Sequence, residues 1–132
     1  MGHIAQRRFG QNFLIDRNIA KKIVKQALIE PNETVIEIGP GQGAITVLLS
    51  EQAKKVIAIE LDRNLIQGLQ HLAGEHSNVS IIEGDALKCY QSVVNEIGKK
   101  PYLVVANIPY NITSAIIRTI LTTTPPASRA VL

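Results

Sequence analysis

Cysteine is almost absent from this chain of 132 residues, which removes several kinds of site from consideration. The single cysteine, Cys89, has no second thiol for an internal disulfide and no neighbouring ligands at the spacing of a zinc site. We interpret Cys89 as a small, partly buried apolar residue in a reducing, cytoplasmic compartment.

Long apolar runs are missing as well. No stretch approaches the roughly 18 consecutive apolar residues of a membrane-spanning helix, and the start, MGHIAQRRFGQNFL, lacks the apolar core of a secretion signal. The 45% of hydrophobic residues can nevertheless fill a core, and the length suits one domain rather than two. We expect one globular domain without a membrane partner.

Acidic residues are missing from one end of the chain and concentrated in its middle. Residues 1–30 carry six basic and two acidic residues, residues 31–97 carry four and nine, and residues 98–132 carry four and none. Two basic ends around an acidic middle could hold a polyanion such as RNA. An ordinary solvated surface is the alternative that charge alone leaves open.

Four apolar runs alternate with helical patterns, which predicts an α/β fold. Their first residues lie 21, 23 and 23 positions apart, a spacing typical of right-handed crossover units and a parallel sheet. The expected strands are Val35–Ile38, Val56–Glu60, Val79–Ile82 and Tyr102–Ala106. The expected helices are Arg17–Ile29, Ala44–Gln52, Arg63–Leu72, Leu87–Ile97 and one that starts near Thr113 or Ser114.

The first of these helices should be amphipathic. Asp16 is placed to cap it, and its apolar face is expected to hold Ile19, Ile23, Val24, Ala27 and Leu28. At the other end of the chain, RAVL follows TTTPPAS and resembles the beginning of a fifth strand. Because a doubly wound sheet rarely stops there, we expect a fragment of a longer protein.

A glycine-rich turn joins the first predicted strand to the next helix. In VIEIGPGQGAIT, Glu37 is followed by Gly39, Gly41 and Gly43 at alternate positions. Glycine lets the backbone adopt positive φ and approach a ligand closely, and the helix N-terminus offers free N–H groups. The pattern predicts a cofactor loop.

Two classes of cofactor compete for this loop. Gly39-x-Gly41-x-x-Ala44 also satisfies the dinucleotide fingerprint, with Glu60 placed 21 residues after Gly39 as a ribose-binding acid. An NAD-dependent dehydrogenase is therefore one hypothesis. Glu60, however, suits the ribose of any adenosine, since a carboxylate accepts from both hydroxyls. Asp62, two residues later, is interpreted as the cap of the next helix.

The ends of the third and fourth strands carry further polar residues. Asp85, in IIEGDAL, could accept from an adenine amine or cap the following helix. Asn107 and Tyr110, in ANIPYNIT, follow the fourth strand. The Asn107 side-chain oxygen and the Ile108 carbonyl could accept from the amine of a flipped base, Pro109 would stiffen the turn, and Tyr110 would stack on the base.

These motifs, taken in order, resemble those of the ribosomal RNA adenine dimethyltransferase family. RRFGQNFLIDRNI is similar to the family's N-terminal lid motif, EIGPGQGAIT to its glycine motif, AIELDRNL and EGDAL to the next two, and NIPYNIT to its catalytic motif. The resemblance covers nearly the whole chain.

The resemblance implies S-adenosylmethionine as cofactor and assigns roles to individual residues. Asn12 and Leu14 would line the methionine end, and Asn107, Ile108, Pro109 and Tyr110 would form the catalytic motif, with Asn107 at the junction of cofactor and substrate. The remaining cofactor-binding residues would be Glu37, Gly39, Gly41 and Gly43 in the loop, Glu60 at the ribose, and Asp85 and Ala86 at the adenine. No metal is implied.

The implied fold is a Rossmann-like methyltransferase sheet of parallel strands in the order 3-2-1-4, followed by a truncated fifth strand, with helices on both faces. Residues 1–30 would form the lid segment and first helix, and residues 31–132 the cofactor-binding core. The family's remaining strands and its C-terminal helical domain lie outside this sequence. The sheet edge they would cover could drive association of the fragment.

The family has two branches, and both remain open on the sequence. The start and the PPASRAVL ending favour the housekeeping enzymes, which dimethylate adenine amines of small-subunit rRNA and would bind a precursor of that subunit. Ile108 is more usual in the antibiotic-resistance branch, which modifies large-subunit rRNA. A non-catalytic rRNA-binding assembly factor is a further alternative. Methyl transfer in this family is direct and needs no nucleophilic side chain.

Overall fold

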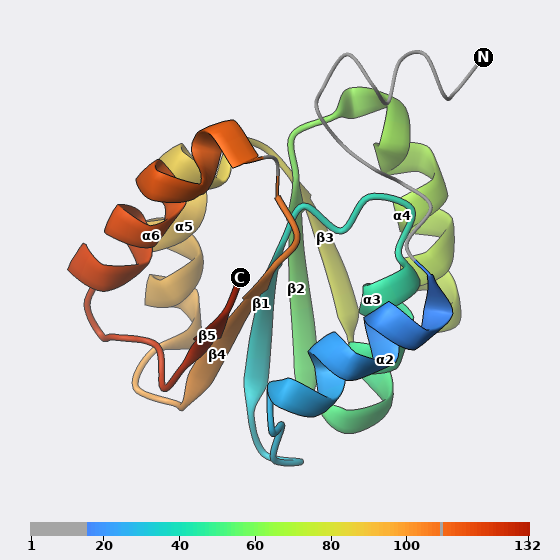
Figure 1. The fold of residues 1–132 in the computed structure, drawn as a ribbon, viewed down its shortest axis with the longest axis horizontal. Helices are drawn as coiled ribbons and strands as arrows, with labels where there is room; N and C mark the ends of the chain where they lie inside the picture. Colours follow the sequence, from blue (N-terminus) through green and yellow to red (C-terminus); the bar gives the residue numbers. More distant parts are fainter. Residues whose placement is uncertain (1–15, 109) are drawn as a thin grey trace.

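The computed structural model describes residues 16–108 and 110–132 of the chain as an α/β sandwich. Five strands are connected by helices on both faces of one sheet (Figure 1). The strands are β1 (Thr34–Ile38), β2 (Lys55–Glu60), β3 (Val79–Glu83), β4 (Tyr102–Ala106) and β5 (Ala130–Val131). The helices are α2 (Arg17–Gln26), α3 (Ala44–Gln52), α4 (Arg63–Glu75), α5 (Ala86–Ile97), η1 (Tyr110–Ile112) and α6 (Thr113–Thr122).

The sheet is entirely parallel, with strand order β3-β2-β1-β4-β5. This order confirms the predicted arrangement of the first four strands, and β5 confirms that RAVL begins a fifth. β1, β2 and β4 are almost wholly buried because helices cover both faces of the sheet, whereas the edge strand β3 is partly exposed. β5 pairs with β4 over only two residues, Ala130 and Val131.

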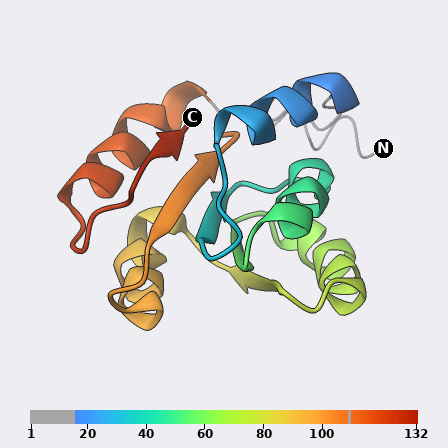
Figure 2. The ribbon, with the colours of Figure 1, turned by 90° about the horizontal axis from the view of Figure 1, so that it is seen from below.

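Two hydrophobic clusters hold the helices to the sheet. Seen from below, the sheet lies between two helical layers (Figure 2). On one face α5 and α6 pack on Ile36, Ile38 and Val104, whereas α2 and α3 pack on Val35 and Leu103 on the other. The alternation along β1 follows from the two-residue period of a strand.

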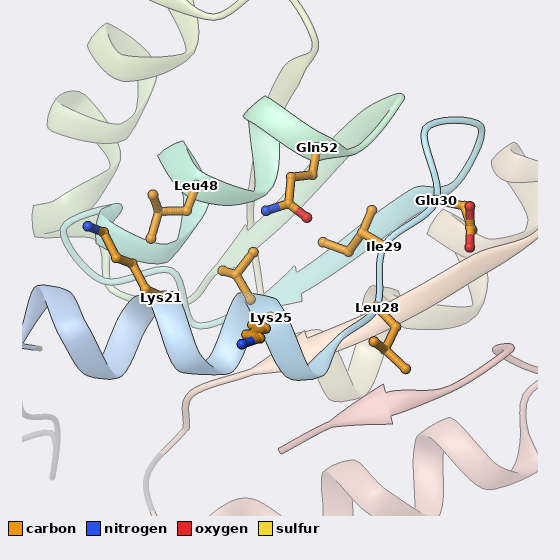
Figure 3. A pocket seen from close by; sticks show the side chains of 8 residues that line it. Lys21, Lys25, Leu28, Ile29, Glu30, Leu48 and Gln52 are labelled. Atoms are coloured by element: carbon orange, nitrogen blue, oxygen red, sulfur yellow. The ribbon is translucent and has the colours of Figure 1, made fainter.

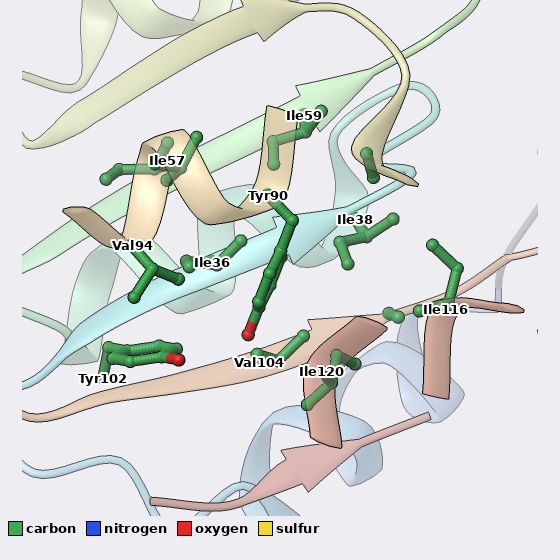
Figure 4. Close-up of a cluster of buried hydrophobic side chains, with 13 residues drawn as sticks. Ile36, Ile38, Ile57, Ile59, Tyr90, Val94, Tyr102, Val104, Ile116 and Ile120 are labelled. Carbon is green, nitrogen blue, oxygen red and sulfur yellow. The ribbon is translucent and has the colours of Figure 1, made fainter. Parts of the chain in front are cut away.

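Tyrosines occupy the middle of the first cluster. Tyr90 and Tyr102 are each 1% exposed, and Figure 4 shows the Tyr90 ring crossing the space above β1 and β4. The Tyr102 hydroxyl donates to the Pro125 carbonyl at 2.6 Å, which fixes the segment that leads into β5. Cys89 packs against this cluster and is partly buried, as predicted.

Three aspartates begin helices as N-caps. Asp16, Asp62 and Asp85 each accept a bond from the backbone N–H two residues later, at 2.6, 2.9 and 3.0 Å. Such caps satisfy N–H groups that the helix itself leaves free. The caps predicted for the helices that follow Asp16 and Asp62 are therefore confirmed, and Asp85 also has this role.

The prediction for the first helix was wrong at its C-terminal end. α2 ends at Gln26 rather than Ile29, and its buried stripe is Ala20, Val24 and Ala27. Ile19 is 54% exposed and Leu28 71% exposed, so neither lies on the buried face. Leu28 has a positive φ of 52°, which ends the helical path before the apolar pattern ends.

An ion pair joins the start of the sheet to its last strand. The Arg129 side chain donates from Nε to the Ala27 carbonyl at 2.7 Å and from Nη2 to the Leu28 carbonyl at 2.9 Å. Nη2 also pairs with Glu33, which is 4% exposed. Burial raises the pKa of Glu33, but hydrogen bonds from Arg129 and the Glu30 N–H outweigh it, and the net pKa lies below its usual value. The Arg129 side chain thus supplies donors to the Ala27 and Leu28 carbonyls, which have no helical N–H partner because the helix has ended.

Within the described ranges, 16–108 and 110–132, no helix has the length and apolar character needed to cross a membrane.

Candidate functional site

The polar residues predicted at the strand ends lie on one edge of the sheet. Ile38 of β1 is in register with Ile59 of β2 and Ala106 of β4. Gly39, Glu60 and Asn107 therefore stand at one level, immediately after these partners. The ladder continues beyond the strands, because the Gly39 N–H donates to Ile59 O at 3.0 Å and the Asn107 N–H to Ile38 O at 3.3 Å.

This edge contains the point where the sheet reverses its order. The chain runs outward from β1 to β2 and β3, then returns to place β4 on the other side of β1. Helices α3 and α4 connect the outward strands on one face, and α5 brings the chain back on the other (Figure 1). In open parallel sheets, ligands bind at the carboxyl ends of the strands beside such a switch point.

The glycine loop approaches β4 at the switch point. Gly39 has φ +73°, and a Cβ at this position would lie 3.1 Å from the Asn107 carbonyl oxygen and 3.4 Å from Ile108 Cγ2. Both the dihedral angle and the space require glycine. Gly43, with φ +94°, precedes α3 as its N-cap, and a Cβ there would lie 2.5 Å from Leu72 Cδ1. The loop is thus packed closely against its neighbours at both ends.

Glu60 connects the β2 end to this loop. Its carboxylate is 1% exposed and accepts from the Gly41 N–H at 3.1 Å and from the Asp62 N–H at 2.8 Å. Burial raises the pKa of Glu60 above its ordinary value, although these two hydrogen bonds oppose the shift. An acid at a strand end can be exposed to solvent, but Glu60 is buried.

Glu37 lies inside the protein, beneath the loop. It is 1% exposed, and the Thr46 hydroxyl of α3 donates to its carboxylate at 2.5 Å. Burial raises its pKa from 4.5 to about 7, against the effect of the Thr46 bond, and the charge of Glu60 adds to the rise. Glu37 supports the strand–loop–helix junction from within, and its predicted contact with a cofactor stays a prediction.

The ends of β2 and β3 carry the other residues predicted to bind a nucleoside. Asp85 is partly buried where it caps α5, and Ala86 is 7% exposed and belongs to the first hydrophobic cluster. Between Glu60 and Asp62, Leu61 is 66% exposed, an apolar side chain on an otherwise polar edge. Sequence reasoning missed Leu61, because nothing in the local sequence shows that this apolar residue is exposed.

The catalytic motif is described only in part. Asn107 is exposed and Ile108 half-buried at the end of β4, and the backbone of Tyr110 begins η1, which leads into α6. The described part of the structure does not include Asn12, Leu14, Pro109 or the side chain of Tyr110. Within the described ranges, no group of three or more histidine, cysteine or acidic residues could hold a metal ion.

The model of the ribosomal RNA adenine dimethylase family matches residues 2–132. The chain belongs to this family. The resemblance inferred from the five motifs is thereby confirmed, and the family gives no support to the dehydrogenase alternative.

The similar proteins include members of both branches. "Ribosomal RNA small subunit methyltransferase A" of Alkaliphilus metalliredigens is 45% identical over 93% of this chain and 44% of its own length. A dimethyladenosine transferase structure from Plasmodium falciparum is 33% identical (TM-score 0.75, 88% of this chain and 40% of that one). The structure of the 23S rRNA methyltransferase ErmE is 34% identical (TM-score 0.75, 86% and 44%). This chain spans less than half the length of each.

A more distant structure has the same fold. The O-methyltransferase TomG from Streptomyces achromogenes, solved in complex with SAM, is 18% identical (TM-score 0.72, 95% of this chain and 60% of that one). Together with the strand order, these likenesses confirm the Rossmann-like methyltransferase fold.

Proposed function

We propose that this dimethylase-family chain is the cofactor-binding part of an enzyme that uses S-adenosylmethionine to dimethylate the exocyclic amine of adenines in small-subunit ribosomal RNA. The observation that carries the proposal is the contact between the glycine loop and the Asn107 carbonyl at the switch point. This contact brings a cofactor loop and an amine-binding turn together in a chain of this family.

The residues of the edge fit this cofactor. Gly39 allows the loop to lie close to the end of β4, where a Cβ would press on the Asn107 carbonyl oxygen. Glu60 uses one lone pair of each carboxylate oxygen for the backbone, and the others would accept from ribose hydroxyls if cofactor binding uncovers this buried carboxylate. Asp85 supplies an acceptor for an adenine amine, and Leu61 an apolar surface for the ring. When bound, S-adenosylmethionine supplies a methyl group on a positively charged sulfur.

The chain's own contribution to the reaction is to align the adenine amine with the methyl group that it receives. The Asn107 side-chain oxygen and the Ile108 carbonyl would accept from its two N–H groups, and Tyr110 would stack on the ring. Alignment of reactants is worth roughly 7–11 kcal/mol. The same oxygens stabilise the positive charge that develops on the amine, and its proton then leaves to water.

The domain boundaries and the partner belong to the same proposal. Residues 1–30 would supply the lid and first helix and residues 31–132 the core, and the substrate would be rRNA in a small-subunit precursor in the cytoplasm. The 45% identical small-subunit relative supports this branch over the large-subunit one. A further part of the protein would complete the RNA contacts, and self-association of the present chain would cover its sheet edge.

Calorimetric titration of the chain with S-adenosylmethionine and, separately, with NAD tests the cofactor. We expect saturable binding of S-adenosylmethionine or its demethylated product, and none of NAD. Binding of NAD without a response to either methionine nucleoside would overturn the proposal.

Transfer of labelled methyl groups to an rRNA fragment with an unpaired adenine, by a longer protein that contains this chain, tests the reaction. Asn107→Ala should reduce the rate about 100-fold or more, since loss of one such acceptor costs on the order of 3 kcal/mol in the transition state. Asn95→Ala, at an exposed position of α5, serves as the control. Binding of the rRNA without any transfer by the unaltered protein would favour a non-catalytic assembly factor instead.

A further inference from the structure

Helix α2 presents basic side chains that form no ion pair with the residues that the structure describes. Arg17, Lys21, Lys22 and Lys25 are all exposed, and none forms an ion pair with a described residue. Arg17, Lys21 and Lys25 are four residues apart, so they line one side of the helix at a spacing of about 6 Å. By contrast, Arg129 near the other basic end is engaged by Glu33. Helix α2 thus carries four basic side chains that pair with no described acid.

A groove of about 540 Å³ runs along this helix, between α2 and α3. Figure 3 shows Lys21 at one end, Glu30 at the other, and Leu48 and Gln52 on the opposite wall. Val24 and Ile29 contribute apolar surface between them. The groove lies apart from the edge that carries Gly39 and Asn107, because it is formed by helices on one face of the sheet.

Leu28, in the wall of the groove, is unusual in two respects. Its side chain is 71% exposed, and its backbone has φ +52°, a conformation that costs free energy for a bulky residue. Asparagine would adopt this φ more readily and would be better solvated. An apolar side chain thus stands at a position where folding alone favours a polar one.

We propose that the α2–α3 groove binds a single-stranded segment of RNA. Phosphates would lie against Lys21 and Lys25, and a base would lie on the apolar surface of Leu28, Ile29 and Leu48. Glu30 would repel a phosphate at the far end, so the phosphates would gather at the lysine end of the groove. The inference rests on the proposed function, in that RNA is the partner, and it adds a contact away from the cofactor edge.

The combination of charges and apolar surface favours RNA over another occupant. A groove that received an apolar segment of protein would gain nothing from Lys21 and Lys25, the two lysines that line it and pair with no described residue. A nucleotide uses both features, since it carries a negative phosphate and a flat, weakly polar base. The side-chain amide of Gln52 can donate a hydrogen bond to a base edge or accept one from it, whichever base is present.

The test measures binding of a fluorescein-labelled single-stranded RNA 12-mer to the chain by anisotropy, over a series of KCl concentrations. Lys21→Gln/Lys25→Gln should lower affinity about fivefold or more and reduce the slope of log K against log salt by about 1.4, or 0.7 for each lost phosphate contact. Lys99→Gln/Lys100→Gln makes the same change in net charge in the exposed turn after α5. It should leave the slope unaltered.

Leu28→Asn tests the apolar part of the groove without risk to the fold. It should weaken RNA binding severalfold while the melting temperature stays equal or rises. Equal effects of the two double-lysine variants, together with unchanged binding by Leu28→Asn, would overturn the proposal. A second outcome would also overturn it. If Leu28→Asn reduces self-association, measured by sedimentation, but leaves RNA binding unchanged, the groove is a protein interface.

Titration of each variant with S-adenosylmethionine separates this inference from the proposed function. All groove variants should bind the cofactor as the unaltered chain does. If no form of the chain binds it, the proposed function fails, whereas the RNA measurements still decide the role of the groove.

Discussion

The carboxylate of Glu60, the last residue of β2, holds the backbone N–H of Gly41 at 3.1 Å, so one strand end fixes the loop that leaves its neighbour. The other oxygen accepts from the Asp62 N–H at the start of α4. A single buried side chain thus sets the relative positions of a strand end, the loop and a helix.

Substitution of Glu60 should affect both the loop and the ligand. Glu60→Ala leaves two backbone N–H groups without an acceptor, which costs about 1–3 kcal/mol of unfolding free energy, and it should weaken S-adenosylmethionine binding about tenfold or more. Chemical denaturation and calorimetry measure the two effects. Glu83→Gln alters an exposed acid at the end of the neighbouring strand β3, where it pairs with Arg63 of α4. It should change stability by less than about 0.5 kcal/mol.

Gly39→Ala tests whether the site requires the close approach of the glycine loop to β4 rather than the flexibility of glycine alone. The substituted residue would keep φ near +73° at a cost of about 1–2 kcal/mol, and its Cβ would press on the Asn107 carbonyl. We expect a lower melting temperature and the loss of most cofactor affinity. Gly68→Ala is the matched control, since that helical glycine has open space around it and alanine should stabilise α4 by about 1 kcal/mol. Normal cofactor binding by Gly39→Ala would show that the contact with β4 is unimportant.

Stability should depend on pH through Glu37. Its pKa is raised from 4.5 to about 7 in the folded protein, so folding takes up a proton between these values. The stabilisation is therefore complete below about pH 4.5 and is lost as pH rises through 7, an effect on the order of 3 kcal/mol. The raised pKa of Glu60 acts in the same sense.

Denaturation of Glu37→Gln between pH 5 and 8 checks this expectation. Glutamine keeps an acceptor for the Thr46 hydroxyl but cannot ionise, so its stability should fall less with pH than that of the unaltered chain. Parallel curves for the two proteins would mean that Glu37 does not titrate in this range.

Arg129→Met should destabilise the chain by about 2–3 kcal/mol. The loss leaves Glu33 buried without its partner and two carbonyls without donors, although the partial exposure of Arg129 keeps the cost below that of a fully buried pair. The double variant Arg129→Met/Glu33→Met should recover part of the loss, as a denaturation cycle would show. Additive losses would indicate that the two side chains do not interact.

Periodicity and strand-end chemistry predicted most of the fold. The four long strands were found at their expected places because each is a continuous apolar run, and the Asp62 cap because aspartate precedes a helical pattern. The first helix was predicted too long, since the apolar pattern continues through Leu28 and Ile29 after the backbone has left the helix. Nothing in the local sequence shows that Arg129, a hundred residues away, satisfies the carbonyls there.

The candidate site was predicted by residue type but not by environment. Sequence showed which polar residues follow the strands, and parallel strands bring such residues to one edge. It did not show that Glu37 and Glu60 are buried with raised pKa values, because burial depends on how the loop closes over them. Leu61 was missed because exposure of an apolar residue is a property of the assembled edge.

The Arg129 contacts also affect the order in which the chain acquires structure. Arg129 bonds to Ala27 and Leu28, 102 and 101 positions earlier in the chain. Contacts of such long sequence separation close a large loop, and proteins rich in them fold slowly. The Ala27 and Leu28 carbonyls at the helix end therefore gain their final hydrogen-bond donor only after the chain up to Arg129 has folded onto the sheet. This helix end should be among the last regions to become protected from hydrogen exchange during refolding.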